Sequence, residues 1–422
     1  MKNTLSVLTF CGFISLFSGA AIADEEAAIE HGRYLASAAD CGACHTVDES
    51  KPFAGGLKIT SPVGNIYSTN ITPDKSTGIG DYSYLDLVRA VRQGISRDGS
   101  VLYPAMPYPS YSRLTDDDMH DLYAFFQKGV QPQSQPNRET DIPWPLNMRW
   151  PLHIWKWAFA NDSVSTPQST DPQWLRGAYI VQSLGHCGAC HTPRGIAFQE
   201  KALDETDSDY LTGAKIDTWY APDLTGSHVS GLGEWSQQDV IDYLDTGKNM
   251  RTTAFGPMKE VITKSTHQMT DDDLKAIAVY LKSLPAKKSE MPLKDDLQTA
   301  QSLALGDVSA IGAQGYVDNC SACHRSDGKG YQNIFPALAH NAAILSNDPS
   351  SVISMILLGG AQAVTESDIT GIAMPDFADQ LNNKQVADIA TFIRNGWGNR
   401  APPVTEADVA KIRQAIMGAK TK

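Results

Sequence analysis

One arrangement of apolar and polar positions recurs three times along the chain. Each copy starts with Thr or Asn, continues with polar residues, and then places apolar residues at i, i+3, i+4 and i+7. This spacing is typical of an amphipathic helix, and the first residue has the side chain of an N-cap. The pattern predicts three equivalent helices with one buried face each, and an aromatic residue stands at the same place in all three. The helices are expected at 115–126, 270–281 and 382–393, with Phe125, Tyr280 and Phe392 as the shared aromatics.

A second shared element precedes each of these helices by many residues. It is predicted as a helix that contains a glycine and a tyrosine. Glycine inside a helix costs about 1 kcal/mol, so its recurrence indicates that another part of the chain packs closely there. The aromatic residue of the later helix is the candidate. The three pairs are Gly32 with Tyr34, Gly177 with Tyr179, and Gly312 with Tyr316.

Breaks in the pattern divide the 422 residues into three repeated domains. Seven prolines between positions 131 and 172 predict a linker without regular elements, and 285–305 reads as a second, shorter break. The domains are therefore expected at 24–160, 161–296 and 297–422. Their helical patterns predict an all-α fold with little sheet.

The first 23 residues are predicted to be a secretory signal peptide. Lys2 precedes an apolar run over 5–19, and Ala21-Ile22-Ala23 has the small residues of a cleavage site. The run is short for a membrane span, although a retained anchor is the alternative. No other stretch is long enough to cross a bilayer, so any membrane association should be peripheral or through a partner.

Composition adds one exclusion. The chain carries 35 Lys and Arg against 48 Asp and Glu, a net charge of -13. Nucleic-acid binding needs a basic face, so a nucleic-acid partner is not expected. Hydrophobic residues at 42% and charged residues at 20% indicate a globular protein rather than a disordered one.

The cysteines carry the chemistry. Cys11 lies in the predicted signal peptide, and the other six form three CxxCH blocks, one in each repeat. This is the attachment signature of c-type haem, in which two thiols bond to the haem and the following His ligates the iron. The blocks predict three covalently bound haem c groups. Their residues are Cys41, Cys44 and His45; Cys187, Cys190 and His191; and Cys320, Cys323 and His324.

Two other functions of CxxC pairs fit less well. A structural zinc site needs two pairs about 15–20 residues apart, whereas these pairs are more than 130 residues apart and odd in number. A thioredoxin-like redox pair needs a βαβ context, which none of the three flanking sequences shows.

The sixth iron ligand is expected to be a methionine from a loop between each haem block and the later helix. A thioether ligand raises the potential, and neighbouring prolines hold such loops. Met106, Met258 and Met374 have this position, with Met250 as the competitor of Met258. His186 is expected to pack at a haem edge. Met119, Met269 and Met355 are assigned to packing.

The chain also resembles a known family. Stretches such as KPFAGGL, LYPAMPYPSY, DIPWPLNMRWPL, LGHCGACHTPRG, MTDDDLKAIAVYLKSLP and CHRSDGKGY are similar to the triheme cytochrome c subunits of bacterial membrane-bound dehydrogenases that oxidise alcohols, gluconate, sorbitol or fructose. The resemblance covers nearly all of the chain after the signal peptide. It implies three tandem class I cytochrome c-like domains, with the cysteines, histidines and three loop methionines above as the haem sites.

What the resemblance implies about function goes further. A separate catalytic subunit with FAD or PQQ would oxidise the substrate, accompanied by a small chaperone-like subunit. This chain would pass the electrons to ubiquinone on the periplasmic side of the inner membrane. The first alternative is an independent periplasmic triheme shuttle. The second is a haem enzyme such as a peroxidase, which would need one open iron and a pocket with acid–base residues.

Two segments bear on membrane contact. Four tryptophans fall between 144 and 157, and they suit a membrane interface, a partner surface or packing between domains. The C-terminal tail from 401 has Val409, Ile412 and Ile416 on one helical side. It could lie on a bilayer or dock on the third domain.

Overall fold

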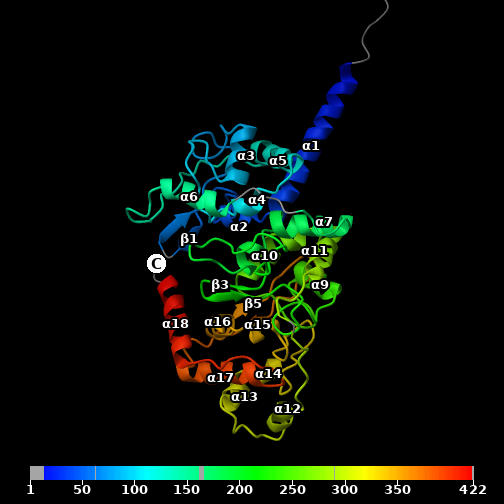
Figure 1. Ribbon diagram of the computed structural model, residues 1–422, viewed down its shortest axis with the longest axis vertical. Helices are drawn as coiled ribbons and strands as arrows, with labels where there is room; N and C mark the ends of the chain where they lie inside the picture. Colours follow the sequence, from blue (N-terminus) through cyan, green and yellow to red (C-terminus); the bar gives the residue numbers. More distant parts are fainter. Residues whose placement is uncertain (1–13, 62, 161–165, 289, 421–422) are drawn as a thin grey trace, which may run out of the picture.

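The computed structural model describes residues 14–61, 63–160, 166–288 and 290–420. Residues 1–13 of the predicted signal peptide, with Cys11, lie outside this range. Three helical domains follow one another in space as in the chain, with domain 1 in blue to cyan, domain 2 in green and domain 3 in yellow to red (Figure 1). Within the described residues, no helix combines the length and apolar character that crossing a membrane requires.

Helices are the main regular element of each domain. Domain 1 contains α1 (Ile14–Ala38), α2 (Cys41–His45), α3 (Tyr84–Gln93), α4 (Tyr108–Tyr111), α5 (Asp116–Ala124), the π-helical turn η1 (Phe125–Gly129) and α6 (Trp150–Phe159). Domain 2 contains α7 (Pro172–Tyr179), the π-helical turn η2 (Ile180–Leu184), α8 (Gly188–His191), α9 (Gln237–Thr246), α10 (Pro257–Lys264), the 3-10 turn η3 (Thr266–Gln268) and α11 (Asp271–Ser283). Domain 3 contains α12 (Leu297–Ala304), α13 (Ala313–Asn319), α14 (Ser321–His324), α15 (Ala342–Leu345), α16 (Ser350–Leu358), α17 (Asn383–Asn395) and α18 (Glu406–Lys420).

Sheet is confined to one short antiparallel hairpin in each domain, among the described residues. The pairs are β1 (Lys58–Ser61) with β2 (Gly64–Tyr67), β3 (Ala214–Ile216) with β4 (Trp219–Ala221), and β5 (Gly360–Ala361) with β6 (Ala373–Met374). In register, Ile59 faces Ile66, Lys215 faces Tyr220, and Gly360 faces Met374. The prediction of an all-α fold in three tandem domains is confirmed.

The three predicted helices with a buried stripe are α5, α11 and α17. Thr115, Thr270 and Asn382 cap them, and each cap side chain accepts a hydrogen bond from the backbone N–H three residues later. Capping satisfies an N–H group that would otherwise lack a partner at the helix start. The shared aromatics Phe125, Tyr280 and Phe392 are all buried.

The recurring glycines lie against the backbone of these helices. A Cβ on Gly32, Gly177 or Gly312 would stand 2.0–2.1 Å from a carbonyl oxygen, so no other residue fits there without movement of the chain. The close approach is to the backbone of these helices, and for Gly32 and Gly177 it is also to the predicted aromatic residue, since the added Cβ would stand 2.7 Å from the Cβ of Phe125 and 2.8 Å from that of Tyr280. For Gly312 the nearest atoms belong to Asp388 and Ile389 instead. Gly312 also differs from its prediction, because it lies just before α13 with φ 82° and not inside a helix. The oxygens belong to Asp121, Ala276 and Asp388, respectively.

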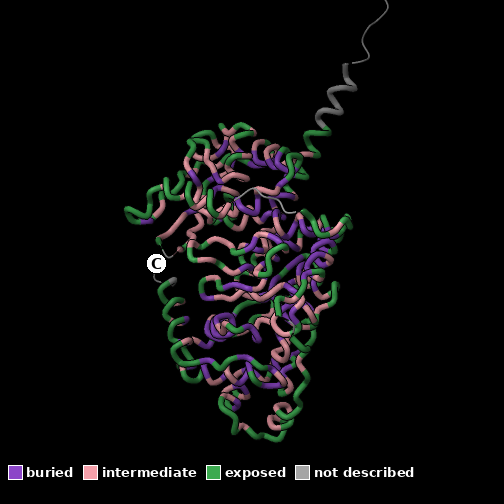
Figure 2. Tube along the Cα trace, viewed as in Figure 1, coloured by how far each residue is buried: buried purple, intermediate pink, exposed green. Residues whose placement is uncertain are grey.

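Domains 1 and 2 share one hydrophobic core, whereas domain 3 has its own. The shared core joins residues such as Leu35 and Met119 of domain 1 to Leu184 and Tyr280 of domain 2. The core of domain 3 forms around α13, α16, α17 and α18. Figure 2 shows buried residues gathered where α7 and α11 meet, and again at α16 and α17.

Two predicted linkers contain helices. The proline-rich stretch 131–172 was expected to lack regular elements, but α6 lies within it and α12 lies within 285–305. Pro151 sits in the first turn of α6, where proline is tolerated because its missing N–H has no helical partner to lose. The C-terminal tail forms α18 and docks on domain 3, with Val409 and Ile412 buried against its core.

Candidate haem sites

Each CxxCH block forms a single helical turn, at α2, α8 and α14. These turns follow the glycine-bearing segments, which are themselves packed on α5, α11 and α17. One helical turn brings both thiols and the following His to the same region, which is what attachment of one haem requires.

The histidines of the three CxxCH blocks each make the same kind of hydrogen bond. In each, ring atom Nδ1 lies within hydrogen-bond distance of a backbone carbonyl oxygen from a later loop. Such a bond fixes the ring and leaves Nε2 as the nitrogen that can ligate iron. The distances are 2.6 Å from His45 to Thr69, 2.7 Å from His191 to Pro222, and 3.0 Å from His324 to Pro336.

Protonation also suits iron ligation. Burial lowers the pKa of all three imidazoles below the ordinary value of 6.5, although the bond to the carbonyl acts in the opposite direction. The neutral form, which binds metals, is thereby favoured. Burial raises the pKa of the Cys41, Cys187 and Cys320 thiols to about 12.

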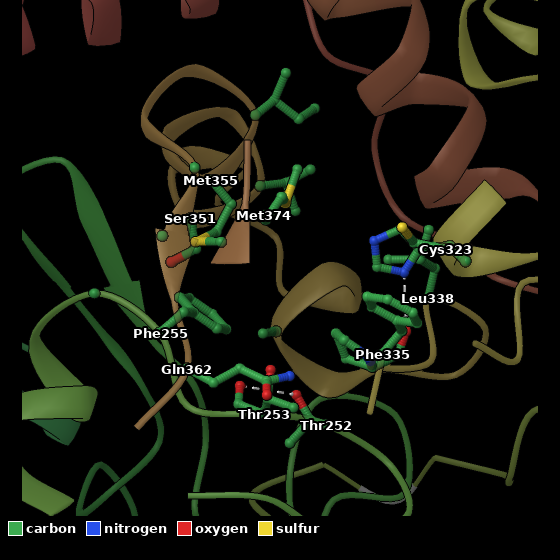
Figure 3. A pocket seen from close by; sticks show the side chains of 18 of the residues that line it. Thr252, Thr253, Phe255, Cys323, Phe335, Leu338, Ser351, Met355, Gln362 and Met374 are labelled. Carbon is green, nitrogen blue, oxygen red and sulfur yellow. Dashed lines mark hydrogen bonds between the residues drawn. The ribbon is translucent and has the colours of Figure 1, made fainter. Parts of the chain in front are cut away.

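A cavity of about 410 Å³ opens beside the block of domain 3. Cys320, Cys323 and His324 line one part of it and Met374 another. In Figure 3 the apolar side chains of Phe335 and Leu338 lie beside Cys323. A mostly apolar cavity between a CxxCH turn and a thioether has the residues that a haem requires, so the lining of this site fits a haem.

The predicted methionine ligands differ in whether they line a cavity beside a CxxCH block. Met374 lines the cavity of domain 3, but so does Met355, which was assigned to packing. Met106 and Met258 are partly buried beside the shared core. Met250, the competitor of Met258, is 65% exposed. Met119 and Met269 are buried in the shared core, which agrees with packing.

His186 packs between its own backbone and a tyrosine of domain 1. Its Nδ1 lies 3.0 Å from the carbonyl oxygen of Leu184, and its ring meets the edge of Tyr111 at 5.5 Å between centroids. Tyr111 belongs to domain 1, so His186 contributes a contact between the first two domains.

Several site residues carry no signal in the sequence. Thr69, Pro222 and Pro336 act through backbone carbonyls, which every residue type possesses. Trp219 and Phe255 of domain 2 line the cavity of domain 3, more than 60 residues before Cys320. Sequence reasoning missed these two because only the docking of the domains brings them there.

Three CxxCH turns, each with its histidine held through Nδ1, define a multidomain c-type cytochrome that binds haem c covalently. A family model for cytochrome c matches three segments of the chain, at residues 29–129, 175–285 and 309–397. The chain therefore belongs to the cytochrome c family, in the group of dehydrogenase cytochrome c subunits described next.

Three relatives are similar over most of their length. The gluconate 2-dehydrogenase cytochrome c subunit of Pantoea cypripedii is 48% identical over 98% of this chain and 95% of its own. The cytochrome c subunit of the quinone-type alcohol dehydrogenase of Gluconacetobacter polyoxogenes is 47% identical over 98% and 91%. The fructose dehydrogenase cytochrome subunit of Gluconobacter japonicus is 40% identical over 91% and 82%.

Proposed function

We propose that this chain is the triheme electron-transfer subunit of a periplasm-facing, membrane-bound dehydrogenase complex. It would take electrons from the FAD or PQQ of a catalytic subunit that oxidises gluconate, a polyol, a sugar or an alcohol, and pass them to ubiquinone. The similarity to three dehydrogenase cytochrome subunits over nearly the full chain carries this proposal. A small chaperone-like subunit completes the proposed complex, and the signal peptide at 1–23 would export the chain.

Each domain would hold one haem c through the same kinds of residue. The haem supplies reversible one-electron oxidation and reduction at its iron. The cysteines fix the group covalently, and each histidine offers Nε2 while its Nδ1 donates to a carbonyl oxygen. Met106, Met258 and Met374 would supply the sixth ligand and keep other molecules from the iron. The attachment residues are Cys41, Cys44, Cys187, Cys190, Cys320 and Cys323, with His45, His191 and His324 as the first axial ligands.

The sixth ligand can be tested in domain 3, where two methionines line one cavity. Met374→Ala should abolish the Fe–S charge-transfer band of one haem and lower its potential, because a thioether ligand raises it. Met355→Ala is the matched control and should leave the band in place. Loss of the band in Met355→Ala alone would move the ligand to that residue.

Purification tests the functional role. From detergent-solubilised membranes, the chain should come with a dehydrogenase subunit and three haems per copy, and substrate should reduce those haems. The reduced protein should not bind carbon monoxide at neutral pH. A cytochrome recovered alone would favour the independent shuttle, and ready carbon monoxide binding would favour a haem enzyme with an open iron.

Contact with the membrane is proposed at α6 and the loop before it. Trp144, Trp150 and Trp157 are 79%, 61% and 78% exposed, and Leu146 and Ile154 are exposed beside them. Residues 142–160 contain no acidic residue, although the chain as a whole is acidic. Exposed tryptophans on a helix without acidic groups suit an anionic lipid surface. Trp155 instead packs inward, since its Nε1 donates to Ala197 at 2.8 Å.

A vesicle-binding assay tests this contact. Replacing Trp150 and Trp157 by Ser should reduce binding of the purified protein to anionic phospholipid vesicles several-fold. The control is Leu305→Ser, an equally exposed apolar residue of domain 3, which is 86% exposed. Unchanged vesicle binding together with loss of the dehydrogenase subunit would assign this face to the protein partner instead.

A further inference from the structure

Domain 2 supplies part of the wall around the cavity of domain 3. Trp219, Phe255, Gly256 and Lys259 line it, opposite residues of domain 3 such as Met355. Figure 3 shows Phe255 entering the same space as Met355 and Met374. The third haem site is therefore built by two domains and is incomplete in domain 3 alone.

Trp219 is tightly seated in this wall. A Cβ on Gly256 would stand 2.9–3.0 Å from three atoms of its indole ring, and Gly256 has φ 54°, which favours glycine. The ring of Phe255 lies 5.8 Å from the indole, between centroids, at 40°. The indole thus covers a backbone position where a side chain has no room.

The same residues lie next to both proposed axial ligands of the second haem. Trp219 begins β4, and this strand leads within three residues to Pro222, whose carbonyl oxygen accepts from His191. Gly256 caps α10, whose second residue is Met258. The segments that hold the two axial ligands of one haem therefore meet at the indole of Trp219.

Hydrogen bonds to domain 3 keep the hairpin in place. The N–H of Tyr220 donates to Ser351 Oγ at 2.9 Å, and the same hydroxyl donates back to the Tyr220 carbonyl at 3.0 Å. Ser354 donates to the carbonyl of Thr218 at 2.6 Å. Both serines belong to α16, and Ser351 itself lines the cavity. Movement of β4 would therefore disturb both haem sites together.

We propose that Trp219 is a positioning residue shared by the second and third haem sites, acting together with Phe255. It holds the loop that presents Met258 to the second haem, and it closes the side of the cavity that the third haem would occupy. This proposal rests on the proposed triheme function. Electron exchange across this wall moves one electron from a ferrous to a ferric iron, with no bond formed or broken and no proton moved.

The test uses the holoprotein with Trp219→Leu. One haem should lose or weaken its Fe–S charge-transfer band, because the Met258 loop is released. Two of the three midpoint potentials should shift while the third stays unchanged, since the second and third sites share the wall and the first does not. Met258→Ala and Met374→Ala identify which band and potential belong to which site, and Trp219→Phe should restore most of the wild-type spectrum.

Trp235→Leu is the matched control. Trp235 also belongs to domain 2, is also half-buried and also lies against one aromatic ring, that of Tyr243 at 5.5 Å, but it is not part of the cavity wall. It should leave all three potentials as they are. If Trp219→Leu behaves like this control while three haems and their Fe–S bands are present, the shared wall is refuted and the triheme function stands. If the wild-type protein lacks Met-ligated haems, the functional proposal itself fails.

A second variant keeps the test informative if Trp219→Leu folds poorly. Gly256→Ala should weaken the same Fe–S band in the wild-type background, because the new Cβ meets the indole. In the Trp219→Leu background it should have a smaller additional effect, since only the strained φ remains. Equal additional effects in both backgrounds would show that the indole does not act through Gly256.

Discussion

The interface between domains 1 and 2 differs in kind from the interface between domains 2 and 3. Domains 1 and 2 bury apolar residues in one continuous core, with Leu35 and Leu184 as members from either side. Domain 3 folds around its own core and meets domain 2 through polar bonds, a small apolar cluster and the cavity. Two of the repeats are therefore packed around one core, while the third docks on them.

Reciprocal hydrogen bonds strengthen the first pairing. Tyr34 of domain 1 donates to Asp273 of domain 2 at 2.5 Å, and Tyr179 of domain 2 donates to Asp118 of domain 1. Each acceptor lies in the first turn of the other domain's Thr-capped helix, α5 in domain 1 and α11 in domain 2. The two repeats thus contact each other through equivalent residues, as the subunits of a symmetric dimer do.

The tyrosine of the third segment turns inward, and it stands four residues after Gly312, whereas Tyr34 and Tyr179 stand two residues after their glycines. Tyr316 donates to the carbonyl of Arg325 within its own domain at 2.5 Å. The docking of domain 3 on domain 2 depends instead on residues such as Lys248 of domain 2, which is 2% exposed. Its ammonium group donates to Asp368 at 3.0 Å and to the Thr370 carbonyl at 2.6 Å, both in domain 3. The comparison teaches that repeats with similar helices can form different interfaces, because the tyrosine of the third segment stands two positions later relative to its glycine.

The largest expected effect comes from the cores. Leu35→Ala should destabilise the protein by about 3 kcal/mol, because it leaves a cavity in fully buried packing. Leu35→Ala should increase hydrogen exchange in both α5 and α11, which belong to different domains. Ile353→Ala should increase exchange in α17 of domain 3. Hydrogen exchange under mild denaturant measures this. Leu305→Ala, at a position 86% exposed, is the control, and unchanged exchange in α11 of Leu35→Ala would contradict a shared core.

Asp273→Ala should have the next largest effect, a loss of about 2 kcal/mol. Asp273 accepts two bonds of 2.7 Å from Arg176 as well as the bond from Tyr34, and all three donors would lose this partner. Urea unfolding of the holoprotein measures the loss. The adjacent Asp272→Ala is the control, because that side chain is 93% exposed and its removal should change little.

Paired tyrosine variants separate the two kinds of interface. Tyr34→Phe removes the bond to Asp273 and a long bond of 3.4 Å from the Thr270 N–H, whereas Tyr316→Phe removes one bond. Each variant should cost about 1 kcal/mol. Tyr34→Phe should increase hydrogen exchange in α1 and α11, which belong to different domains. Tyr316→Phe should affect domain 3 alone. Exchange confined to domain 1 in Tyr34→Phe would argue against a bond between domains.

The smallest effect is a pH dependence. Burial acts to raise the pKa of Asp273, but its bonds from Arg176 and Tyr34 outweigh burial and bring it below the ordinary value of 3.8. The stability that this carboxylate adds is therefore present above pH 3.8 and is lost as pH falls through its lower folded value. Asp273→Asn should flatten the fall in unfolding free energy below that pH. An identical slope in both proteins would contradict the assignment.

Much of the local structure could be predicted from the sequence alone. The N-caps at Thr115, Thr270 and Asn382, the buried helical stripes and the CxxCH turns depend on residues close together in the chain. The prediction that 131–172 lacks regular elements failed at α6, because proline counts do not distinguish a linker from a helix with proline in its first turn. In the second break, α12 begins only after the last proline of that stretch. Met355 was assigned to packing because its spacing on a helix does not reveal the cavity beside it.

The sequence by itself determined three c-type attachment blocks, because thiol and imidazole chemistry belongs to particular side chains at a particular spacing. Only the tertiary structure decided which carbonyl oxygen accepts the hydrogen bond from each histidine, since every residue has a carbonyl group and only folding selects one. It also decided that Tyr34 and Tyr179 bond to the neighbouring domain while Tyr316 does not. Trp219 reaches the cavity of domain 3 for the same reason: contacts between distant segments depend on how the domains dock, which no local pattern records.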